Sequence, residues 1–325
     1  MGELHPQMKA ILDLLAKRSE GMPKLHEVTP QLGRFAMEAT FTQFWNEDAP
    51  PIAKMADREM EGPRGPIPIR LYDPEAAASS ACLIYFHGGG FVIGSIASHD
   101  GICRRLANYS GLRVISVGYR LAPEHKFPQP LEDCVASVRW IAAHAPSLGV
   151  DPANLFVGGD SAGANLALVT AMLLRDAGGP ALKGAVLLYG TYVGDLETPS
   201  VKAFGGGDYF LTTEDMKWFS RHYLNGPQDL KDFRAYPIHG NLAGLPPLFI
   251  AAAEFDPLLD DSAALAARLT GLGAPHRHVV WPGVTHGCLH MTRMLDPADG
   301  FLRDIAAWMK QQSATPAESK TAGTA

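Results

Sequence analysis

Cysteine is scarce in this sequence: its 325 residues contain four cysteines and no Cys-x-x-Cys pair. Widely separated cysteines in apolar surroundings are typical of reduced core residues, and not of a disulfide framework. The four are Cys82, Cys103, Cys134 and Cys288. We therefore expect a cytoplasmic globular protein.

The sequence also lacks a long apolar run and an excess of basic residues. Its longest apolar run, Leu245 to Ala253, falls short of the roughly 20 residues that a bilayer-spanning helix needs, and it holds two prolines. The first 25 residues have a helical apolar stripe among charged residues, unlike a secretion signal. With 28 Lys and Arg against 34 Asp and Glu, the net charge is −6, which disfavours binding to a phosphate backbone. We expect neither a membrane nor a nucleic acid as partner.

From about residue 82 onward, short apolar runs alternate with longer helical patterns, which is typical of successive β-α-β units with a largely parallel sheet. The predicted strands are Cys82–Phe86, Arg113–Val117, Leu155–Gly158, Gly184–Tyr189, Pro247–Ala252 and His278–Trp281. The predicted helices are 99–110, 130–145, 162–177, 213–224, 260–272 and 297–312. Upstream, Pro66–Tyr72 alternates with period two and is predicted as an antiparallel edge strand, where proline is tolerated. The predicted fold class is α/β, with a mostly parallel central sheet flanked by helices.

Two stretches do not follow this alternation. Residues 1–45 have helical patterns, and residues 194–239 are rich in aromatic side chains. The aromatic stretch is compatible with an ordinary packing layer and, equally, with a lid over a site. Residues 313–325 are rich in Ala, Thr, Ser, Lys and Glu, and we predict that they form a disordered tail.

Gly159-Asp160-Ser161-Ala162-Gly163 is the strongest chemical signal in the chain. It follows a predicted strand and opens an alanine-rich predicted helix, which is the strand–turn–helix context of a G-x-S-x-G nucleophile turn. Such a turn strains the backbone of its serine, and the residues two before and two after must be small, as Gly159 and Gly163 are. We predict that Ser161 is a nucleophile; the alternative is a glycine-rich turn whose serine caps a helix.

A serine hydroxyl needs a histidine to accept its proton and a carboxylate to orient that histidine. Around a nucleophile turn of this kind the chain order is serine, acid, histidine. His286 lies in a glycine-flanked loop past the last predicted strand, where a catalytic group should emerge, and His290 is the second choice. Asp256 lies just past the preceding predicted strand, with Glu254 as the fallback. We predict a catalytic triad of Ser161, Asp256 and His286.

Acyl transfer also needs N–H donors for the developing oxyanion. The run His87-Gly88-Gly89-Gly90-Phe91 directly follows a predicted strand, and residues without side chains let consecutive N–H groups turn toward a ligand. We predict that Gly88, Gly89 and Ala162 form the oxyanion hole. The alternatives are a flexible turn or a phosphate loop, but the spacing of nucleotide-binding motifs is absent.

A metal site is the remaining chemical alternative. His286 and His290, with Cys288 between them, partly match a zinc-binding helix, but Gly287 stands where the His-Glu-x-x-His motif has its glutamate. We therefore expect neither a metal nor another cofactor.

Taken in order, these motifs resemble those of the hormone-sensitive-lipase-like branch of the α/β-hydrolases, microbial esterases with a Gly-Asp-Ser-Ala-Gly turn. The matching segments are 87–91, 119–124, 159–163, 256–258 and 286–287. The resemblance implies an α/β-hydrolase catalytic domain over 46–312, with an N-terminal helical cap segment over 1–45 to which 195–235 contributes. It also implies that the protein hydrolyses small-molecule substrates that are short- to medium-chain acyl esters. Enzymes of this branch are frequently homodimers.

Two other functions stay open from the sequence. Amides and carbamates pass through the same kind of tetrahedral oxyanion, so the motifs separate them poorly from esters. A ligand-binding receptor on the same scaffold, as in the plant gibberellin receptors, lacks the catalytic histidine, whereas His286 is present here. Aromatic residues of the 194–239 stretch are predicted to line the acyl pocket, which favours small or aromatic esters. They are Phe204, Tyr209, Phe210 and Trp218.

Overall fold

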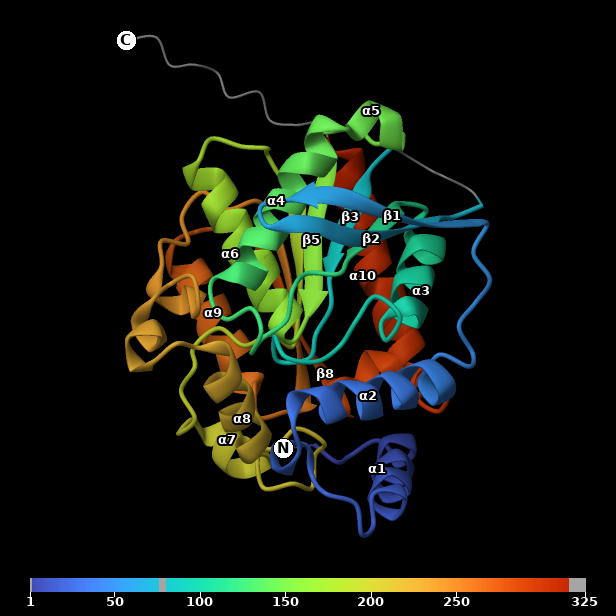
Figure 1. The fold of residues 1–325 in the computed structure, drawn as a ribbon, viewed down its shortest axis with the longest axis vertical. Coiled ribbons are helices and arrows are strands. Elements are labelled where there is room, and N and C mark those ends of the chain that lie inside the picture. The colour runs from blue at the N-terminus through green and yellow to red at the C-terminus, as the bar shows by residue number, and fades with distance from the viewer. Residues whose placement is uncertain (1, 76–79, 316–325) are drawn as a thin grey trace.

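The computed structural model describes residues 2–75 and 80–315, and an eight-stranded sheet forms its centre (Figure 1). In space the strands follow the order β1-β2-β4-β3-β5-β6-β7-β8. Their bounds are β1 Lys54–Gly62, β2 Gly65–Asp73, β3 Cys82–Phe86, β4 Arg113–Val117, β5 Leu155–Asp160, β6 Gly184–Leu188, β7 Leu248–Phe255 and β8 His276–Thr285. Strands β3 to β8 pair in parallel, and β1 and β2 join antiparallel at one side. The predicted α/β class with a mostly parallel sheet is confirmed.

The antiparallel side differs from the prediction by one strand. The segment predicted as the edge lies in β2, but β2 is an inner strand, because β1 pairs with it from Lys54 to Gly62 and becomes the edge. Most side chains of β1 are exposed, so β1 carries no apolar run that would have predicted it. A charged edge strand also resists pairing with other chains.

Helices cover both faces of the sheet. Their bounds are α3 Asp100–Ser110, α4 Gln129–Ala143, α5 Ala145–Leu148, α6 Ala162–Asp176, α9 Leu259–Gly271 and α10 Asp296–Ala314. Helices α4, α6 and α9 pack on one face, and α3 and α10 pack on the other (Figure 1). Along β3, Ile84 and Phe86 join the first of these cores, whereas Leu83 and Tyr85 join the second. Burial on both faces explains why the central strands are continuous apolar runs in the sequence.

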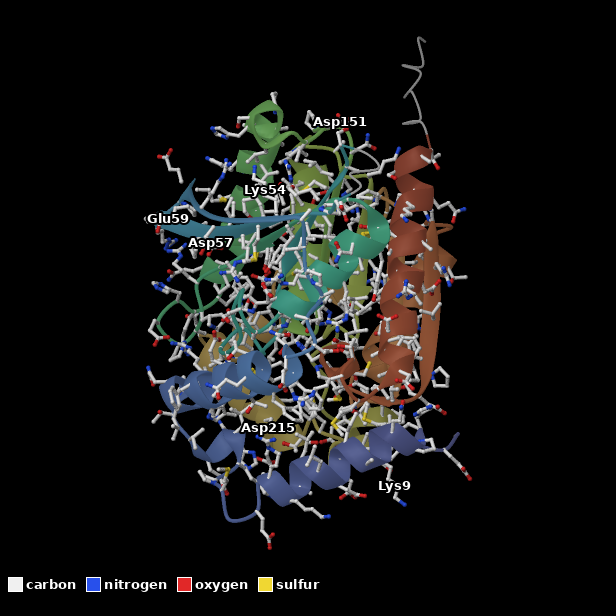
Figure 2. The ribbon with its side chains drawn as sticks, turned by 90° about the vertical axis from the view of Figure 1, so that its right-hand side faces the viewer. Lys9, Lys54, Asp57, Glu59, Asp151 and Asp215 are labelled. Atoms are coloured by element: carbon white, nitrogen blue, oxygen red, sulfur yellow. The ribbon has the colours of Figure 1, made fainter. Side chains whose placement is uncertain are left out.

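The two stretches outside the alternation gather at the carboxyl end of the parallel strands. Their larger elements are α1 Pro6–Arg18, α2 Pro30–Thr40, the π-helical turn η2 Phe41–Trp45, α7 Pro199–Phe204 and α8 Thr213–Tyr223. The stretches touch each other, since the side chains of His26 and Asp215 share a hydrogen bond of 2.8 Å. Figure 2 shows Lys9 of α1 and Asp215 of α8 at the end of the molecule opposite to Lys54 and Asp151. The helical pattern of residues 1–45 is therefore realised as helices that cover this end of the sheet.

The carboxyl-terminal helix is longer than predicted. Helix α10 continues to Ala314, so Ser313 and Ala314, which we assigned to a disordered tail, are helical. The rest of that predicted tail, from residue 316, lies outside the described residues. In the ranges 2–75 and 80–315, no helix combines the length and the apolar character needed to cross a bilayer.

Candidate active site

The turn between β5 and α6 holds Ser161 in a strained backbone conformation. Its φ is 54° and its ψ is −119°, a region that side chains rarely occupy. Gly159 and Gly163 both pack against the carbonyl oxygen of Phe86, and a Cβ on either glycine would overlap that oxygen. The two glycines are therefore required by the close approach of β3 to the turn, as expected for a nucleophile turn.

The predicted acid and base lie at the carboxyl ends of the last two strands, β7 and β8. Asp256 directly follows β7, and His286 directly follows β8. His286 Nε2 lies 2.9 Å from Ser161 Oγ, and His286 Nδ1 lies 2.7 Å from Asp256 Oδ2. Asp256 is 0% exposed and His286 is 6% exposed, whereas Ser161 is half-buried. The three side chains thus form one chain of hydrogen bonds whose serine end faces outward.

Neighbouring groups hold this arrangement in place. The backbone N–H of Leu258 donates to Asp256 Oδ1 at 2.8 Å, which occupies the carboxylate oxygen that does not face His286. The ring of Tyr189 stands edge-on to the His286 imidazole, with centroids 4.9 Å apart. Leu258 fixes the Asp256 carboxylate and Tyr189 packs on the imidazole, so the imidazole has little freedom to turn away from Ser161.

The two fallback residues have other roles. The Glu254 carboxylate accepts the N–H groups of Gly283 and Gly2, at 2.9 and 2.7 Å, and so ties the amino-terminal residues to the last part of strand β8. His290 lies beside Asp160 and not beside Ser161: its Nε2 is 3.8 Å from Asp160 Oδ2.

The glycine loop after β3 corrects one sequence prediction. The N–H of Gly88 donates to Asp160 Oδ1 at 3.0 Å and also lies 3.1 Å from His99 Nε2. This N–H is therefore taken up by side chains and is not a free donor for an oxyanion. The N–H groups of Gly89 and Ala162 have no hydrogen-bond partner within the described residues, and neither does that of Gly90. The sequence showed that the loop is rich in glycine, but not which of its N–H groups are left without a partner.

Of the four aromatic residues predicted to line the pocket, three pack elsewhere and one lies near His286. Phe204 and Tyr209 pack against Phe255, with centroid distances of 5.6 Å each, and Trp218 is buried against α2. Phe210 alone among the four reaches the loop that carries His286, where its ring lies next to Gly287.

One aromatic residue beside the glycine loop was not among those predicted from the sequence. The ring of Phe219 lies against Gly90, so closely that a Cβ at that position would overlap it. The side chain comes from α8, one residue after Trp218. The helical spacing of α8 indicates that Trp218 and Phe219 lie on different faces of the helix. The sequence does not show which of these faces turns toward the glycine loop.

A second cluster of ionisable groups lies directly behind the nucleophile turn. His99, Asp160 and His290 each offer one possible metal ligand, and these atoms lie within 4.8 Å of one another. The Asp160 carboxylate already accepts the O–H of Tyr85 at 2.8 Å and the N–H of Gly88. Hydrogen bonds from protein groups thus satisfy the Asp160 carboxylate and His99 Nδ1, whereas His290 Nδ1 is buried without a partner among the described residues.

The electrostatics of that cluster follow from its burial. Burial alone would raise the pKa of Asp160, but the charges and hydrogen bonds of His99 and His290 outweigh it and hold this pKa well below its usual value. Burial lowers the pKa of His290 to about 4, so this ring is neutral near pH 7. A buried, ionised carboxylate therefore lies one residue before the predicted nucleophile.

Comparisons with known proteins agree with this geometry. A family described as the alpha/beta hydrolase fold matches residues 83–290. An acetyl esterase of Salmonella choleraesuis is 35% identical over 319 residues, which cover 96% of each chain. Among solved structures, an ester hydrolase from the metagenome of Lake Arreo is 40% identical with a TM-score of 0.91. A hyperthermophilic esterase from the archaeon Pyrobaculum calidifontis is 37% identical with a TM-score of 0.92. Each structure covers 96% of this chain and 100% of its own.

The chain belongs to the α/β-hydrolase family, in the hormone-sensitive-lipase-like branch that its motifs predicted. Within that branch it is a carboxylic ester hydrolase.

Proposed function

We propose that this enzyme hydrolyses short- to medium-chain acyl esters through a Ser161–His286–Asp256 triad and an acyl-enzyme. Ser161 Oγ attacks the ester carbonyl carbon while His286 Nε2 accepts the hydroxyl proton, and His286 then gives that proton to the departing alcohol. Water attacks the acyl-enzyme in the same way, losing a proton to His286, and Ser161 leaves with that proton. Asp256 keeps Nδ1 protonated and stabilises the imidazolium. The contacts of 2.9 and 2.7 Å along this chain of atoms carry the proposal.

The oxyanion of each tetrahedral intermediate needs fixed N–H donors. We assign this role to Gly89 and Ala162, and add Gly90, because their N–H groups have no partner among the described residues and lie in the nucleophile turn and in the glycine loop beside it. Gly88 is left out, since its N–H is donated to Asp160. Removing one such donor typically lowers turnover about 10²- to 10³-fold.

The size of the acyl group is set by what covers the site. Phe210 lies next to Gly287 and Phe219 lies next to Gly90, so one aromatic ring stands at the loop that carries His286 and another at the glycine loop. Both come from the 195–235 segment, which together with residues 1–45 we propose as the cap. Rings this close to the catalytic loops favour a small acyl group, in agreement with the name of the acetyl esterase relative.

The test is a series of p-nitrophenyl esters from acetyl to palmitoyl, with wild type and two variants. We expect Ser161→Ala to lower turnover on the order of 10⁶-fold. Ser137→Ala serves as the control, because Ser137 is buried in α4, where its hydroxyl donates to the carbonyl of Cys134, and should retain wild-type turnover. Wild-type activity in Ser161→Ala would refute the triad assignment. A preference for the palmitoyl ester would refute the proposed chain length.

A matched amide, p-nitroacetanilide, belongs in the same series. We expect slower turnover of the amide than of p-nitrophenyl acetate, since an anilide nitrogen is the poorer leaving group. Faster amide turnover would favour the amidase alternative. The receptor alternative loses support because His286 is present and lies 2.9 Å from Ser161.

A further inference from the structure

We propose that Asp160, held by His99 and His290, is a positioning residue that sets the oxyanion loop relative to Ser161. The proposal rests on the proposed function and adds a second role within the nucleophile turn. Asp160 precedes the nucleophile in sequence, and its carboxylate binds the N–H of Gly88, which precedes the proposed donor Gly89. One carboxylate therefore ties the two loops whose separation decides whether an oxyanion fits.

The hydrogen bonds around Asp160 leave it little freedom. Its Oδ1 accepts the O–H of Tyr85 at 2.8 Å and the N–H of Gly88 at 3.0 Å, and lies 3.2 Å from His99 Nε2. Asp160 is 3% exposed. A hydrogen bond to a buried charge is shorter and stronger than one between neutral groups. The Gly88 N–H is consequently held in one direction, which orients the following peptide before substrate arrives.

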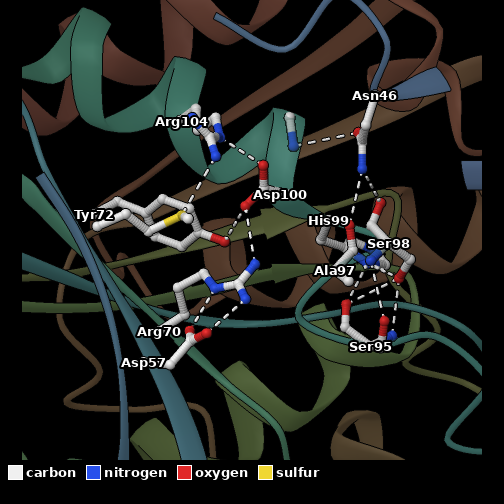
Figure 3. A network of polar contacts seen from close by, with 12 residues as sticks. Asn46, Asp57, Arg70, Tyr72, Ser95, Ala97, Ser98, His99, Asp100 and Arg104 are labelled. Carbon is white, nitrogen blue, oxygen red and sulfur yellow. Dashed lines mark hydrogen bonds and ion pairs between the residues drawn. The ribbon is translucent and has the colours of Figure 1, made fainter. Parts of the chain in front are cut away.

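His99 is itself fixed from the side remote from Asp160. Its Nδ1 lies 2.8 Å from Ser98 Oγ and 3.3 Å from the carbonyl of Ser95. The Asn46 amide donates to the carbonyls of Ala97 and Ser98, at 2.9 and 3.4 Å, as Figure 3 shows.

The amino-terminal segment thus reaches the catalytic centre through this loop. Asn46 follows the π-helical turn η2, and Glu38 of α2 accepts the Ser95 hydroxyl at 2.6 Å. From the same segment, the ring of Phe41 stands edge-on to His290, with centroids 4.4 Å apart. Residues far from Ser161 in sequence therefore help to hold Asp160, and through it the Gly88 peptide.

The experiment compares Asp160→Asn with Asp100→Asn. Asp100 is the next residue after His99, but its carboxylate faces Arg70, Tyr72 and Arg104 (Figure 3). The Gly88 N–H contacts Asp160 and His99, and among the described residues no hydrogen bond joins it to Asp100. Two quantities are measured: kcat for p-nitrophenyl acetate, and the inhibition constant of an alkyl trifluoromethyl ketone. In that adduct Ser161 Oγ bonds to the carbonyl carbon, the serine proton passes to His286, and the ketone oxygen becomes an oxyanion.

We expect Asp160→Asn to lower kcat about 10- to 100-fold, less than the 10²- to 10³-fold loss of a whole donor. The inhibition constant should rise by a similar factor, with KM changed less than about threefold, because only states with an oxyanion need the aligned loop. Asp100→Asn should leave both quantities at wild-type values. Wild-type kcat and inhibition in Asp160→Asn, or equal losses in both variants, would overturn the proposal.

Two further variants keep the test decisive. If Asp160→Asn does not fold, Asn46→Ala replaces it: kcat and ketone affinity should then fall together, by about 3- to 10-fold, and unchanged values would overturn the proposal. Ser161→Ala is measured alongside. An active Ser161→Ala would remove the proposed function, whereas an inert one beside an unaffected Asp160→Asn would remove only the positioning role.

Discussion

Two buried pairs of an aspartate and a histidine lie near Ser161. They consist of the same residue types, but their surroundings differ. On one side Asp256 lies 2.7 Å from His286. On the other, Asp160 lies 3.2 Å from His99. Both carboxylates lie at the carboxyl end of a strand, and both are nearly inaccessible to solvent.

The second imidazole nitrogen makes the difference. His286 points its Nε2 at the half-buried Ser161 hydroxyl, where a substrate can arrive. His99 points its Nδ1 at Ser98 in the protein interior. An aspartate–histidine pair is therefore not a catalytic signature by itself; its chemistry depends on whether the far nitrogen faces a reacting atom or the protein scaffold.

The two systems also differ in what supports them. Behind the triad, Asp261 of α9 accepts the N–H groups of Tyr192 and Val193, at 2.6 and 2.9 Å, just past the Tyr189 ring that packs on His286. Behind Asp160, the support comes from Asn46, which directly follows the helical stretch of residues 1–45. One system is supported by the sheet domain, the other by chain that lies outside the β-α-β alternation.

The largest effect that distinguishes the Asp256–His286 pair from the Asp160–His99 pair is expected on kcat in Asp256→Asn. An asparagine cannot keep His286 in the tautomer that accepts the serine proton, so kcat should fall about 10⁴-fold, as in other triads of this type. Steady-state hydrolysis of p-nitrophenyl acetate measures it. Glu254→Gln is the matched control, since Glu254 bonds only backbone N–H groups here and should keep kcat within about threefold. A larger loss in Glu254→Gln than in Asp256→Asn would assign the acid to Glu254.

The next effect is on stability in acid, and it concerns the Asp160 side. Burial lowers the pKa of His290 to about 4, against about 6.5 in an unfolded chain. The folded protein binds fewer protons than the unfolded chain between these values, so stability present above pH ~6.5 is lost as the pH falls to ~4. The loss is on the order of 3 kcal/mol.

His290→Phe removes this titration. Urea unfolding from pH 4 to pH 8 should show the free energy of unfolding of wild type falling in acid relative to that of the variant. A difference between the two proteins that stays constant over this range would contradict the assignment of His290 as a buried neutral ring.

An effect of opposite sign, and at most of similar size, is expected behind the proposed triad. Burial raises the pKa of Asp261 to about 6, although the N–H groups of Val193 and Tyr192 oppose the shift. A carboxyl group with a raised folded pKa holds its proton more tightly in the folded state, so stability is lost as the pH rises from ~3.8 to ~6, by about 3 kcal/mol at most. In Asp261→Asn the amide oxygen can still accept both N–H groups. The same urea series should show wild type losing stability relative to this variant as the pH rises, and the reverse slope would refute it.

Much of the fold was predictable because parallel strands that are buried on both faces consist of continuous apolar runs in the sequence. The predicted strands around Cys82, Arg113 and Leu155 coincide with β3, β4 and β5, since neighbouring helices bury both of their faces. The edge strand β1 was not predictable in this way. Its exposed, charged residues form a strand because β2 offers unpaired backbone groups, which is a property of the neighbour and not of the segment.

The candidate site divides along the same line. Ser161, Asp256 and His286 each lie just beyond a recognisable strand, so position along the chain was enough to select them. The N–H of Gly88 was misassigned because its partners, Asp160 and His99, come from two other segments of the chain. No local pattern tells three consecutive glycines apart.

By itself, the sequence determined the strand–helix alternation, the nucleophile turn and the order of serine, acid and histidine, because each depends on residues adjacent in the chain. The tertiary structure decided which glycine N–H groups are free, and that Asn46 supports the loop carrying His99. These outcomes depend on hydrogen-bonding groups that meet only after the sheet and its covering helices have packed. A buried donor or acceptor must find its partner there, wherever in the chain that partner lies.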